Sequence, residues 1–281
     1  MKRDGWSLLR LHYARSGNLK LSSLQLVVRF ERAMERIQTG VKGLDELLEG
    51  GLPKGKCILV VGSPGAGKTI LLMQFLRSGA LADERGLYVA MDETPEQVKG
   101  NMSSFGWNLD ELEGNGRLLF LDATTLRQRG IRRSSVLVPG IEEISAEPTM
   151  NVRVLVQTIL RIVKEEGIQR ITVDPITSIM LRYDQPYKRR RAMLMFFDAL
   201  IESGCTSLIT TELRTSVLRR SFQLEEFLSQ GVILLHSFVH AGNVVRAIQV
   251  EKMRGIAHDA QIRPYQITSN GIEVYPKDRV F

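Results

Sequence analysis

The sequence predicts an α/β fold: a mostly parallel, twisted sheet flanked by helices, with an antiparallel edge in the C-terminal part of the chain. Between residues 57 and 212, apolar runs rich in β-branched residues alternate with helical patterns, as is typical of parallel sheets. After residue 231, short strand-like runs follow one another across turns, which favours antiparallel hairpins. One of the parallel units carries a glycine-rich loop between its strand and its helix.

The composition is that of a soluble globular protein with one large domain, or one domain and an arm. The chain has 281 residues, of which 43% are hydrophobic and 25% charged. No apolar run approaches the roughly 18 residues of a membrane span, and the N-terminus lacks the apolar stretch of a secretory signal. Cys57 and Cys205 each open a strand-like run, so we expect buried, reduced thiols and a cytoplasmic location.

The net charge of +7 is concentrated in the first part of the chain. Residues 1–33 hold seven basic and two acidic side chains, a net +5, so that only +2 of the total remains for residues 34–281. Because the charges of residues 34–281 nearly balance, the net charge of the chain is weak evidence for nucleic-acid binding by the core. We expect a basic N-terminal arm or extension at 1–33, a compact domain at 34–276 and a short tail at 277–281.

A short helix precedes the glycine-rich loop. Leu44, Leu47 and Leu48 lie on one face of this helix. The pair Gly50–Gly51 ends the helix, and Pro53 prevents its continuation.

The loop at 62–69 has the pattern G-x-x-x-x-G-K-[ST] between the apolar run Cys57–Val61 and a helix expected to reach about Ala80. That strand–loop–helix context is the one that a phosphate-binding loop requires. Its glycines leave room for backbone N–H groups around a polyphosphate, and the helix directs its positive end at the anion. The helix is expected to face inward with Leu71, Leu72, Phe75 and Leu76.

A polyphosphate and Mg²⁺ are the expected ligands of this loop. Lys68 is expected to reach the β- and γ-phosphates, and Thr69 to offer its hydroxyl to Mg²⁺. The expected nucleotide-binding residues of this segment are Gly62, Ser63, Pro64, Gly65, Ala66, Gly67, Lys68, Thr69 and Ile70.

Two acids follow the second strand, Gly86–Met91. Asp92 and Glu93 come before Thr94, which caps the next helix, and Pro95 fits its first position. Ligands of open α/β sheets bind beyond the carboxyl ends of the strands, so the two carboxylates suit polarisation of an attacking water. The alternative is an acidic pair favoured by the positive end of the helix.

The middle of the chain is expected to hold a third strand, an irregular segment and an amphipathic helix. The strand covers Leu118–Leu121, and the irregular segment covers 122–150. A basic cluster in that segment indicates a solvated loop, or secondly a phosphate or subunit contact; it contains Arg127, Arg129, Arg132 and Arg133. The helix at 151–166 is expected to bury one face, which carries Val152, Leu155, Ile159 and Val163.

The run Ile171–Asp174 is a buried strand that ends in an acid, with Pro175 expected to start a short helix. Downstream of a phosphate loop this is the Walker B pattern, in which Asp174 would hold the water shell of Mg²⁺. A helix then opens at Lys188 and ends near Ser203, and Cys205–Glu212 forms another strand with polar residues at its carboxyl end.

Four runs close the chain as strands separated by turns: Val232–Leu235, Val244–Val250, Gln261–Ile267 and Gly271–Val274. We find no internal repeat in the sequence, so a single module of this kind is expected.

Over about residues 36–276 the sequence resembles the KaiC branch of the RecA-like ATPases. Beyond the phosphate loop, the motifs that carry the resemblance are Gly43–Asp45, Gly50–Pro53, Asp92–Pro95, Ser104–Trp107, Asp174, Thr210–Glu212, Lys252–His258 and Ile267–Ile272. The resemblance implies a RecA-like P-loop ATPase core that forms a hexamer or a related ring, with ATP between subunits.

The resemblance also implies roles for individual residues. Asp92 and Glu93 fall at a catalytic glutamate pair, and Ser104 falls near the adenine. From the neighbouring subunit would come Lys252, Met253, Arg254 and His258, with Lys252 and Arg254 towards the phosphates, and also Thr268 and Ser269. The end of the strand at 210–212 would sense the γ-phosphate through Thr210, Thr211 and Glu212.

Two departures from the family pattern limit what carries over. Asp92 is one methylene shorter than the glutamate that it replaces, which predicts slow hydrolysis if this position is the base. Where clock members of the family carry a phosphorylated Ser-Thr pair, this chain has Glu225–Leu228, so autophosphorylation is not expected.

The leading expectation is an oligomeric Mg-ATP-dependent ATPase that acts as a regulatory or signalling switch with an unknown protein partner. The second is a DNA recombination or repair ATPase, supported by the basic arm, by the loop containing Arg214, Arg219 and Arg220, and by Phe30–Ala33. That tetrapeptide has the F-x-x-A spacing with which recombinases resembling RadA contact a neighbouring subunit. The third is a non-hydrolysing ATP-binding assembly factor.

Overall fold

The computed structural model describes residues 34–124, 132–133, 152–213, 223–240 and 242–280. From Arg36 onward the chain forms one compact unit. The basic arm with Phe30–Ala33, the arginines at 127 and 129, and the arginines at 214, 219 and 220 lie outside the described residues. In the described ranges, no helix has the length and apolar character needed to cross a membrane.

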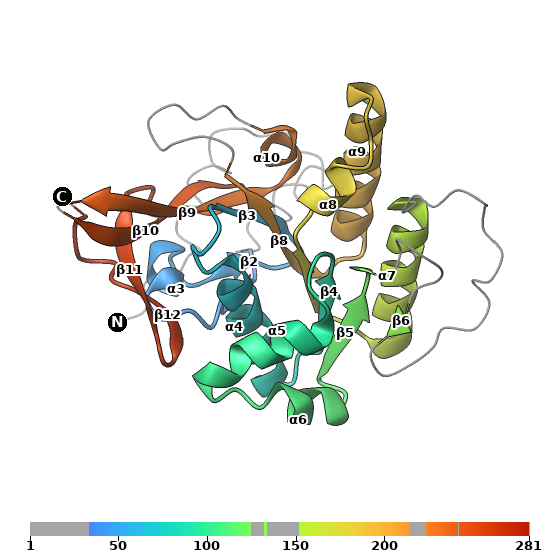
Figure 1. Ribbon diagram of the computed structural model, residues 1–281, viewed down its shortest axis with the longest axis horizontal. Coiled ribbons are helices and arrows are strands. Elements are labelled where there is room, and N and C mark those ends of the chain that lie inside the picture. Colours follow the sequence, from blue (N-terminus) through green and yellow to red (C-terminus); the bar gives the residue numbers. More distant parts are fainter. Residues whose placement is uncertain (1–33, 125–131, 134–151, 214–222, 241, 281) are drawn as a thin grey trace, which may run out of the picture. The chain divides into compact units, whose positions relative to one another are not determined.

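Ten of the described strands build one large sheet in the order β12-β11-β10-β9-β3-β8-β7-β4-β5-β6 (Figure 1). Its central strands run parallel; they are β3 (Cys57–Gly62), β4 (Gly86–Ala90), β5 (Leu118–Asp122), β7 (Arg170–Asp174), β8 (Thr206–Glu212) and β9 (Gly231–His240). Antiparallel strands flank them; they are β6 (Arg132–Arg133), β10 (Asn243–Met253), β11 (Arg263–Thr268) and β12 (Gly271–Val274). The predicted fold class is confirmed.

β9 corrects one detail of the sequence prediction, which treated 232–235 only as a hairpin strand. Gly231 to Leu235 pair in parallel with Ile58 to Gly62 of β3, and the other side of β9 pairs antiparallel with β10. A strand pairs with a neighbour on each of its two edges. The turn that follows β9 in the sequence indicates only its antiparallel neighbour β10, and not the strand on its other edge. β9 therefore joins the parallel and antiparallel parts of the sheet.

Helices cover both faces of the sheet (Figure 1). One core cluster packs under α3 (Leu44–Leu47), α4 (Lys68–Leu81), α5 (Pro95–Met102) and α6 (Leu109–Gly114). The other packs under α7 (Val152–Glu166), α8 (Thr177–Met180), α9 (Pro186–Glu202) and α10 (Leu224–Leu228). Alternate residues of β3 enter different clusters, as the two-residue period of a strand requires: Ile58 and Val60 join the first, and Leu59 and Val61 the second.

The remaining elements are short. β1 (Arg36–Ile37) and β2 (Leu52–Pro53) form a separate two-stranded sheet, and the 3₁₀ helix η1 (Ser103–Phe105) follows α5. The helix predicted at 44–48 is present and buries its three leucines. The expected buried thiols are also found, at Cys57 and Cys205.

Three local predictions need correction. In α7 Val163 is only half-buried, and Ile162 takes the interior position, because the helix turns by 100° per residue and Val163 lies at the margin of the buried face. Pro175 does not start the next helix, which begins at Thr177. The segment predicted to be irregular at 122–150 holds the short strand β6, paired with β5.

The buried side chain of Arg170 ties β7 to α4 and to the loop that follows it. The Arg170 side chain, which is 3% exposed, donates to Glu84 Oε2 at 2.6 Å and to the Phe75 carbonyl oxygen at 2.8 Å. Burial lowers the pKa of Arg170, and Glu84 opposes that shift. Gly79 makes room for the guanidinium, because a Cβ there would lie 2.4 Å from Arg170.

Glu84→Ala is expected to lower the free energy of unfolding by about 3 kcal/mol, because it leaves a buried guanidinium without its carboxylate. Asp110→Ala is the matched control: its side chain is 79% exposed and its partner Lys99 keeps Glu113, so a loss below about 1 kcal/mol is expected. Urea denaturation measures both. Equal losses in the two variants would contradict the structural importance of the Arg170 pair.

Candidate nucleotide site

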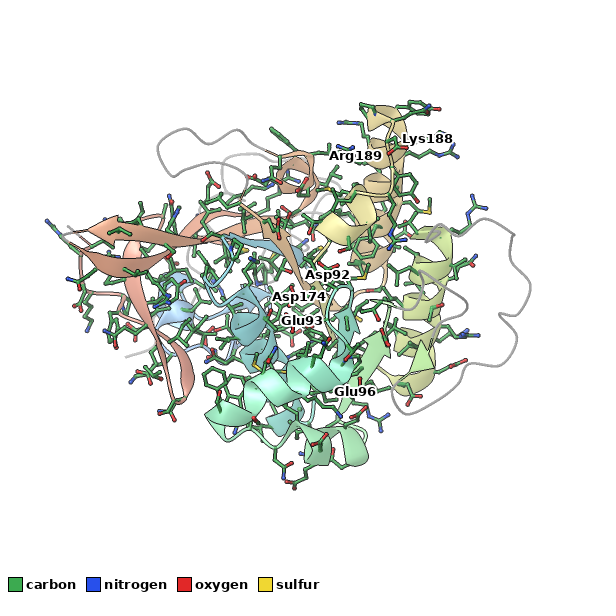
Figure 2. The ribbon with its side chains drawn as sticks, viewed as in Figure 1. Asp92, Glu93, Glu96, Asp174, Lys188 and Arg189 are labelled. Atoms are coloured by element: carbon green, nitrogen blue, oxygen red, sulfur yellow. The ribbon has the colours of Figure 1, made fainter. Side chains whose placement is uncertain are left out.

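The candidate site lies where four neighbouring parallel strands end. The end of β3 leads into the phosphate loop, and β8, β7 and β4 follow in that order across the sheet. Ala90 at the end of β4 pairs with Asp174 at the end of β7. Figure 2 shows Asp92, Glu93 and Asp174 gathered at this edge, with Lys188 and Arg189 of α9 well apart from them. The parallel topology thus brings distant sequence segments to one edge.

The phosphate loop has the backbone that its glycines predict. Gly65 and Gly67 have φ angles of 77° and 87°, which side chains with a Cβ rarely adopt. A Cβ at Gly65 would meet no atom within 4 Å, whereas one at Gly67 would lie 3.1 Å from Ile267. The loop is therefore open at Gly65 and packed at Gly67, where the 14-residue helix α4 begins. An open loop at a helix N-terminus suits a polyphosphate.

The Lys68 ammonium lies across this loop. Its Nζ donates to the carbonyl oxygens of Gly62 at 2.8 Å and Ser63 at 3.1 Å. Burial lowers the pKa of Lys68, while Asp174 and Glu212 oppose that shift. The cation is thus beside the loop that the sequence assigned to phosphates.

Asp174 receives hydroxyl donors from three elements. Thr69 of α4 donates to Oδ2 at 2.6 Å, Tyr88 of β4 donates to the same oxygen at 2.9 Å, and Thr210 of β8 donates to Oδ1. Thr69 and Asp174 were predicted to act together at a metal, and they are in direct contact. Sequence reasoning missed Tyr88, which is an ordinary residue of an apolar strand when seen in sequence alone.

The two acids after β4 each have a donor that sequence reasoning also missed. The Ser178 hydroxyl of α8 donates to Asp92 Oδ1, and Asn101 Nδ2 of α5 donates to Glu93 Oε2 at 2.9 Å. Both carboxylates are exposed to solvent. The arrangement leaves the carboxylates accessible to a water at this edge while limiting their rotation.

The residues predicted as sensors do not all face the metal side. Thr210 contacts Asp174, but the Thr211 hydroxyl donates to Glu225 Oε1 at 3.1 Å on the other face of β8. Glu212 ends the strand with an exposed side chain, beside Gly62 of β3. The alternation of a strand explains why consecutive threonines point apart.

Ser104 lies near Glu93, and the β11–β12 turn belongs to a hairpin that contacts α4. The Ser104 hydroxyl of η1 donates to the Asn101 carbonyl oxygen at 3.4 Å, so η1 is linked to the residue that holds Glu93. Thr268 and Ser269 belong to the β11–β12 turn, and Tyr265 of β11 donates from its hydroxyl to the Ala66 carbonyl oxygen at 2.5 Å.

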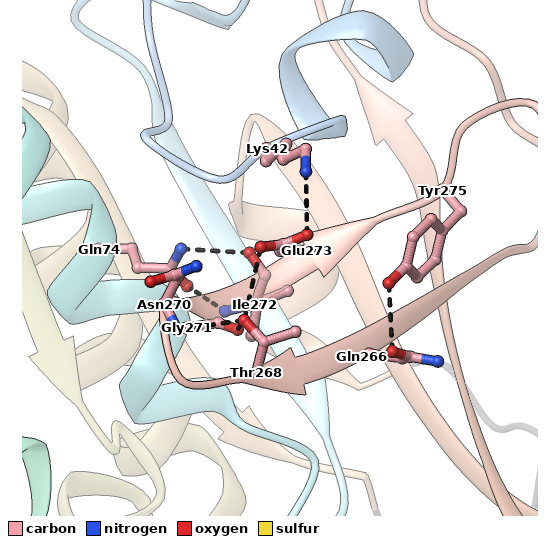
Figure 3. A network of polar contacts seen from close by, with 9 residues as sticks. All are labelled: Lys42, Gln74, Gln266, Thr268, Asn270, Gly271, Ile272, Glu273 and Tyr275. Carbon is pink, nitrogen blue, oxygen red and sulfur yellow. Dashed lines mark hydrogen bonds and ion pairs between the residues drawn. The ribbon is translucent and has the colours of Figure 1, made fainter. Parts of the chain in front are cut away.

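Gln74 fastens this hairpin to α4 of the same chain. Its Oε1 accepts from the Ile272 N–H at 2.7 Å, and its Nε2 donates to the Ile272 carbonyl oxygen at 3.2 Å (Figure 3). The side-chain amide thereby acts as a strand partner for β12. On the outer side, Lys42 and Glu273 form an ion pair at 3.1 Å.

Lys252, Met253 and Arg254 lie at the opposite end of the sheet from the chain's own phosphate loop. Met253 pairs with Gly231, which pairs with Ile58 at the start of β3, whereas the loop follows the end of β3. Lys252 Nζ donates to the carbonyl oxygens of Glu226 at 2.7 Å and Ser229 at 2.8 Å. Burial and the nearby Arg254 lower the pKa of Lys252.

Arg254 is exposed and His258 is half-buried. His258 adjoins Asp259, whose N–H donates to the Leu47 carbonyl oxygen at 2.8 Å. The structure therefore does not bring the Lys252–His258 segment to the loop within one chain.

The residues around Asp174 fit Mg²⁺. The candidate ligands are a threonine hydroxyl and a carboxylate, which are the hard oxygen ligands that Mg²⁺ prefers. Phosphate oxygens and waters ordinarily fill the remaining coordination positions of Mg²⁺. In the part of the chain that the structure describes, no cluster of three or more His, Cys, Asp or Glu residues forms a dedicated metal cage. A metal held jointly with phosphates matches this small set of protein ligands.

Comparison with known proteins identifies the family. The family model "ATPase: KaiC" matches residues 37–279. A UPF0273 protein of Thermotoga maritima is 34% identical over 251 residues, which cover 87% of this chain and 98% of that protein. The circadian clock oscillator protein KaiC of Synechococcus elongatus is 30% identical over 247 residues, which cover 87% of this chain but 45% of KaiC.

Comparison with a solved structure supports the same family. The crystal structure of a KaiC-like protein from Pyrococcus horikoshii matches with a TM-score of 0.72 and 31% identity, covering 86% of this chain and 100% of that one. The resemblance inferred from the motifs is confirmed, and the chain belongs to the KaiC family of RecA-like ATPases.

Proposed function

We propose that residues 34–276 form an ATPase domain that binds Mg-ATP, hydrolyses it slowly and changes its assembly or shape with each nucleotide state. The observation that carries this proposal is the contact of Thr69 with Asp174 beside Lys68. A hydroxyl, a carboxylate and an ammonium at the end of one strand–loop–helix unit are the groups that hold a metal-bound triphosphate.

Each group has a chemical role in this proposal. Backbone N–H groups of the loop bind the phosphates, and Lys68 neutralises charge on the β- and γ-phosphates. Mg²⁺, held through Thr69 and the water shell on Asp174, would supply charge neutralisation on the phosphate oxygens. Asp92 and Glu93 orient and polarise the attacking water. Asp92, with its short side chain and its Ser178 donor, is consistent with slow turnover.

We propose that the site is completed by a second copy of the chain. Lys252 and Arg254 lie at the sheet end away from their own phosphate loop, so they would reach phosphates only on a neighbour. A cation supplied by another subunit stabilises the charge of phosphoryl transfer. A ring, with six subunits as the family resemblance implies, repeats that contact around a closed axis.

The β11–β12 turn is proposed to approach the nucleotide of its own chain, unlike Lys252 and Arg254. The expectation from the resemblance was that Thr268 and Ser269 approach the nucleotide of a neighbour. Their hairpin is fastened to α4 of its own chain through Gln74 and to the phosphate loop through Tyr265, which favours an approach to the chain's own nucleotide.

The proposed role is a regulatory or signalling switch in the cytoplasm, with a protein as its partner. Buried Cys57 and Cys205 suit a reducing compartment. The alternatives are a DNA recombination ATPase and an assembly factor that binds ATP without cleaving it.

The test is steady-state ATPase activity with and without single-stranded DNA, together with light scattering with and without Mg-ATP. Slow hydrolysis that is indifferent to DNA, with ATP-dependent rings, would support the switch. DNA-stimulated turnover that is lost at high salt would favour the recombinase, and tightly bound but uncleaved ATP would favour the assembly factor. Absence of ATP binding would overturn all three.

A further inference from the structure

Tyr88 has a buried hydroxyl in an otherwise apolar environment. The residue lies in the middle of β4, is 1% exposed and packs its ring against Phe120 with 5.7 Å between centroids. Its neighbours belong to the hydrophobic cluster under α4–α6. Within the described chain, the hydroxyl has one hydrogen-bond partner, Asp174 Oδ2 at 2.9 Å.

Apolar packing does not explain that hydroxyl. A phenylalanine would fill nearly the same volume, and a buried hydroxyl is unfavourable unless it is hydrogen-bonded. A phenol is protonated at neutral pH, so the hydroxyl serves as the donor in its contact with Asp174 Oδ2. The contact therefore gives Asp174 a permanent, rigidly placed donor from the neighbouring strand.

The donors around Asp174 together fix the plane of its carboxylate. Tyr88 and Thr69 share Oδ2, and Thr210 holds Oδ1. Thr69 is also the expected metal ligand, so its hydroxyl would turn towards a bound cation. Tyr88 belongs to the sheet core and does not contact the expected phosphate site, so it can hold Asp174 throughout the nucleotide cycle.

We propose that Tyr88 is a positioning residue for the metal site: it orients Asp174 and thereby sets the affinity for the divalent cation, while contributing nothing to nucleotide binding without metal. The inference rests on the proposed Mg-nucleotide function. Hydrogen-bonding partners of metal-holding carboxylates typically change metal affinity by about 10- to 100-fold when removed.

The test compares Tyr88→Phe with Tyr275→Phe, which removes a phenol that donates to Gln266 Oε1 at 3.1 Å outside the site (Figure 3). Mn²⁺ replaces Mg²⁺ as the probe, and electron paramagnetic resonance measures free Mn²⁺ in the presence of ADP. Titration of a fluorescent ADP analogue in EDTA measures metal-free nucleotide binding. Thermal melting in EDTA checks the fold of each variant.

Tyr88→Phe is expected to weaken Mn²⁺ binding about tenfold and to leave nucleotide binding in EDTA unchanged. Tyr275→Phe is expected to change neither. Unchanged Mn²⁺ affinity in Tyr88→Phe, or an equal loss of nucleotide affinity in EDTA, would overturn the positioning role. A wild-type protein that binds ADP without any Mn²⁺ uptake would instead overturn the proposed Mg-nucleotide function.

A double-mutant cycle gives a second measurement that does not depend on comparing folds. With Asp174→Ala as background, the added Tyr88→Phe change is expected to have no further effect on Mn²⁺ affinity, because no carboxylate remains for Tyr88 to orient. A full tenfold effect in that background would show that Tyr88 acts by another route and would overturn the inference.

Discussion

Lys68→Ala is expected to abolish ATP binding at concentrations where the wild-type protein is saturated. The ammonium would supply two charge-assisted hydrogen bonds to phosphates, each worth about 1.5–3 kcal/mol. Their loss corresponds to a fall in affinity of at least about a hundredfold. Titration of a fluorescent ATP analogue, with calorimetry as a second method, measures the change.

Lys56→Ala is the matched control for this prediction. Lys56 immediately precedes β3 at the end opposite to the phosphate loop, so its removal should leave ATP affinity within about twofold of the wild-type value. Thermal melting separates lost binding from lost fold, because Lys68 also donates to the Gly62 and Ser63 carbonyl oxygens. Normal ATP affinity in a folded Lys68→Ala protein would contradict the phosphate-loop assignment.

Arg254→Ala is expected to slow hydrolysis by about a thousandfold or more while ATP still binds, as when a cation supplied by a second subunit or protein is removed. The variant should also form less stable rings, because Arg254 lies on the surface that would contact the neighbour's nucleotide. Single-turnover hydrolysis and light scattering with Mg-ATP measure these effects. Arg279→Ala, at an exposed position after β12, is the control and should behave as wild type.

Mixing the two variants distinguishes a contribution between subunits from one within a chain. In a random mixture of Lys68→Ala and Arg254→Ala chains, about a quarter of the interfaces would combine an intact loop with an intact arginine from the neighbour. Hydrolysis should therefore reappear although each variant alone is inactive. If the mixture stays inactive while mixed rings form, Arg254 does not act on a neighbour, and unchanged turnover of Arg254→Ala would remove its role entirely.

Much of the candidate site could be predicted because its main groups lie in short contiguous motifs. The residues from Gly62 to Thr69 are consecutive, and a phosphate loop needs no distant residue to be recognised. Asp174 follows a run of buried strand residues directly, so its position at the carboxyl end of a strand also follows from local sequence. The contact between Thr69 and Asp174 requires in addition that β3 and β7 run parallel and lie close in the sheet, with β8 between them.

The donors that hold the acids could not be predicted in this way. Tyr88, Ser178 and Asn101 come from a strand interior, a short helix and a helix end, and each is an ordinary residue in its own segment. Their contacts depend on which strands are neighbours and on how the helices lie over the sheet. Residues that are adjacent in sequence can also have different partners: Thr210 contacts Asp174, whereas Thr211 contacts Glu225.

The sequence by itself determined the fold class, the family, the phosphate loop and the Walker B acid, because each is encoded by local pattern and consecutive residues. Only the tertiary structure decided that β9 has both a parallel and an antiparallel neighbour. It alone placed Lys252 and Arg254 at the far end of the sheet and Tyr88 on Asp174. The physical reason is that strand order and side-chain contacts arise from packing between segments distant in sequence, which no local pattern records.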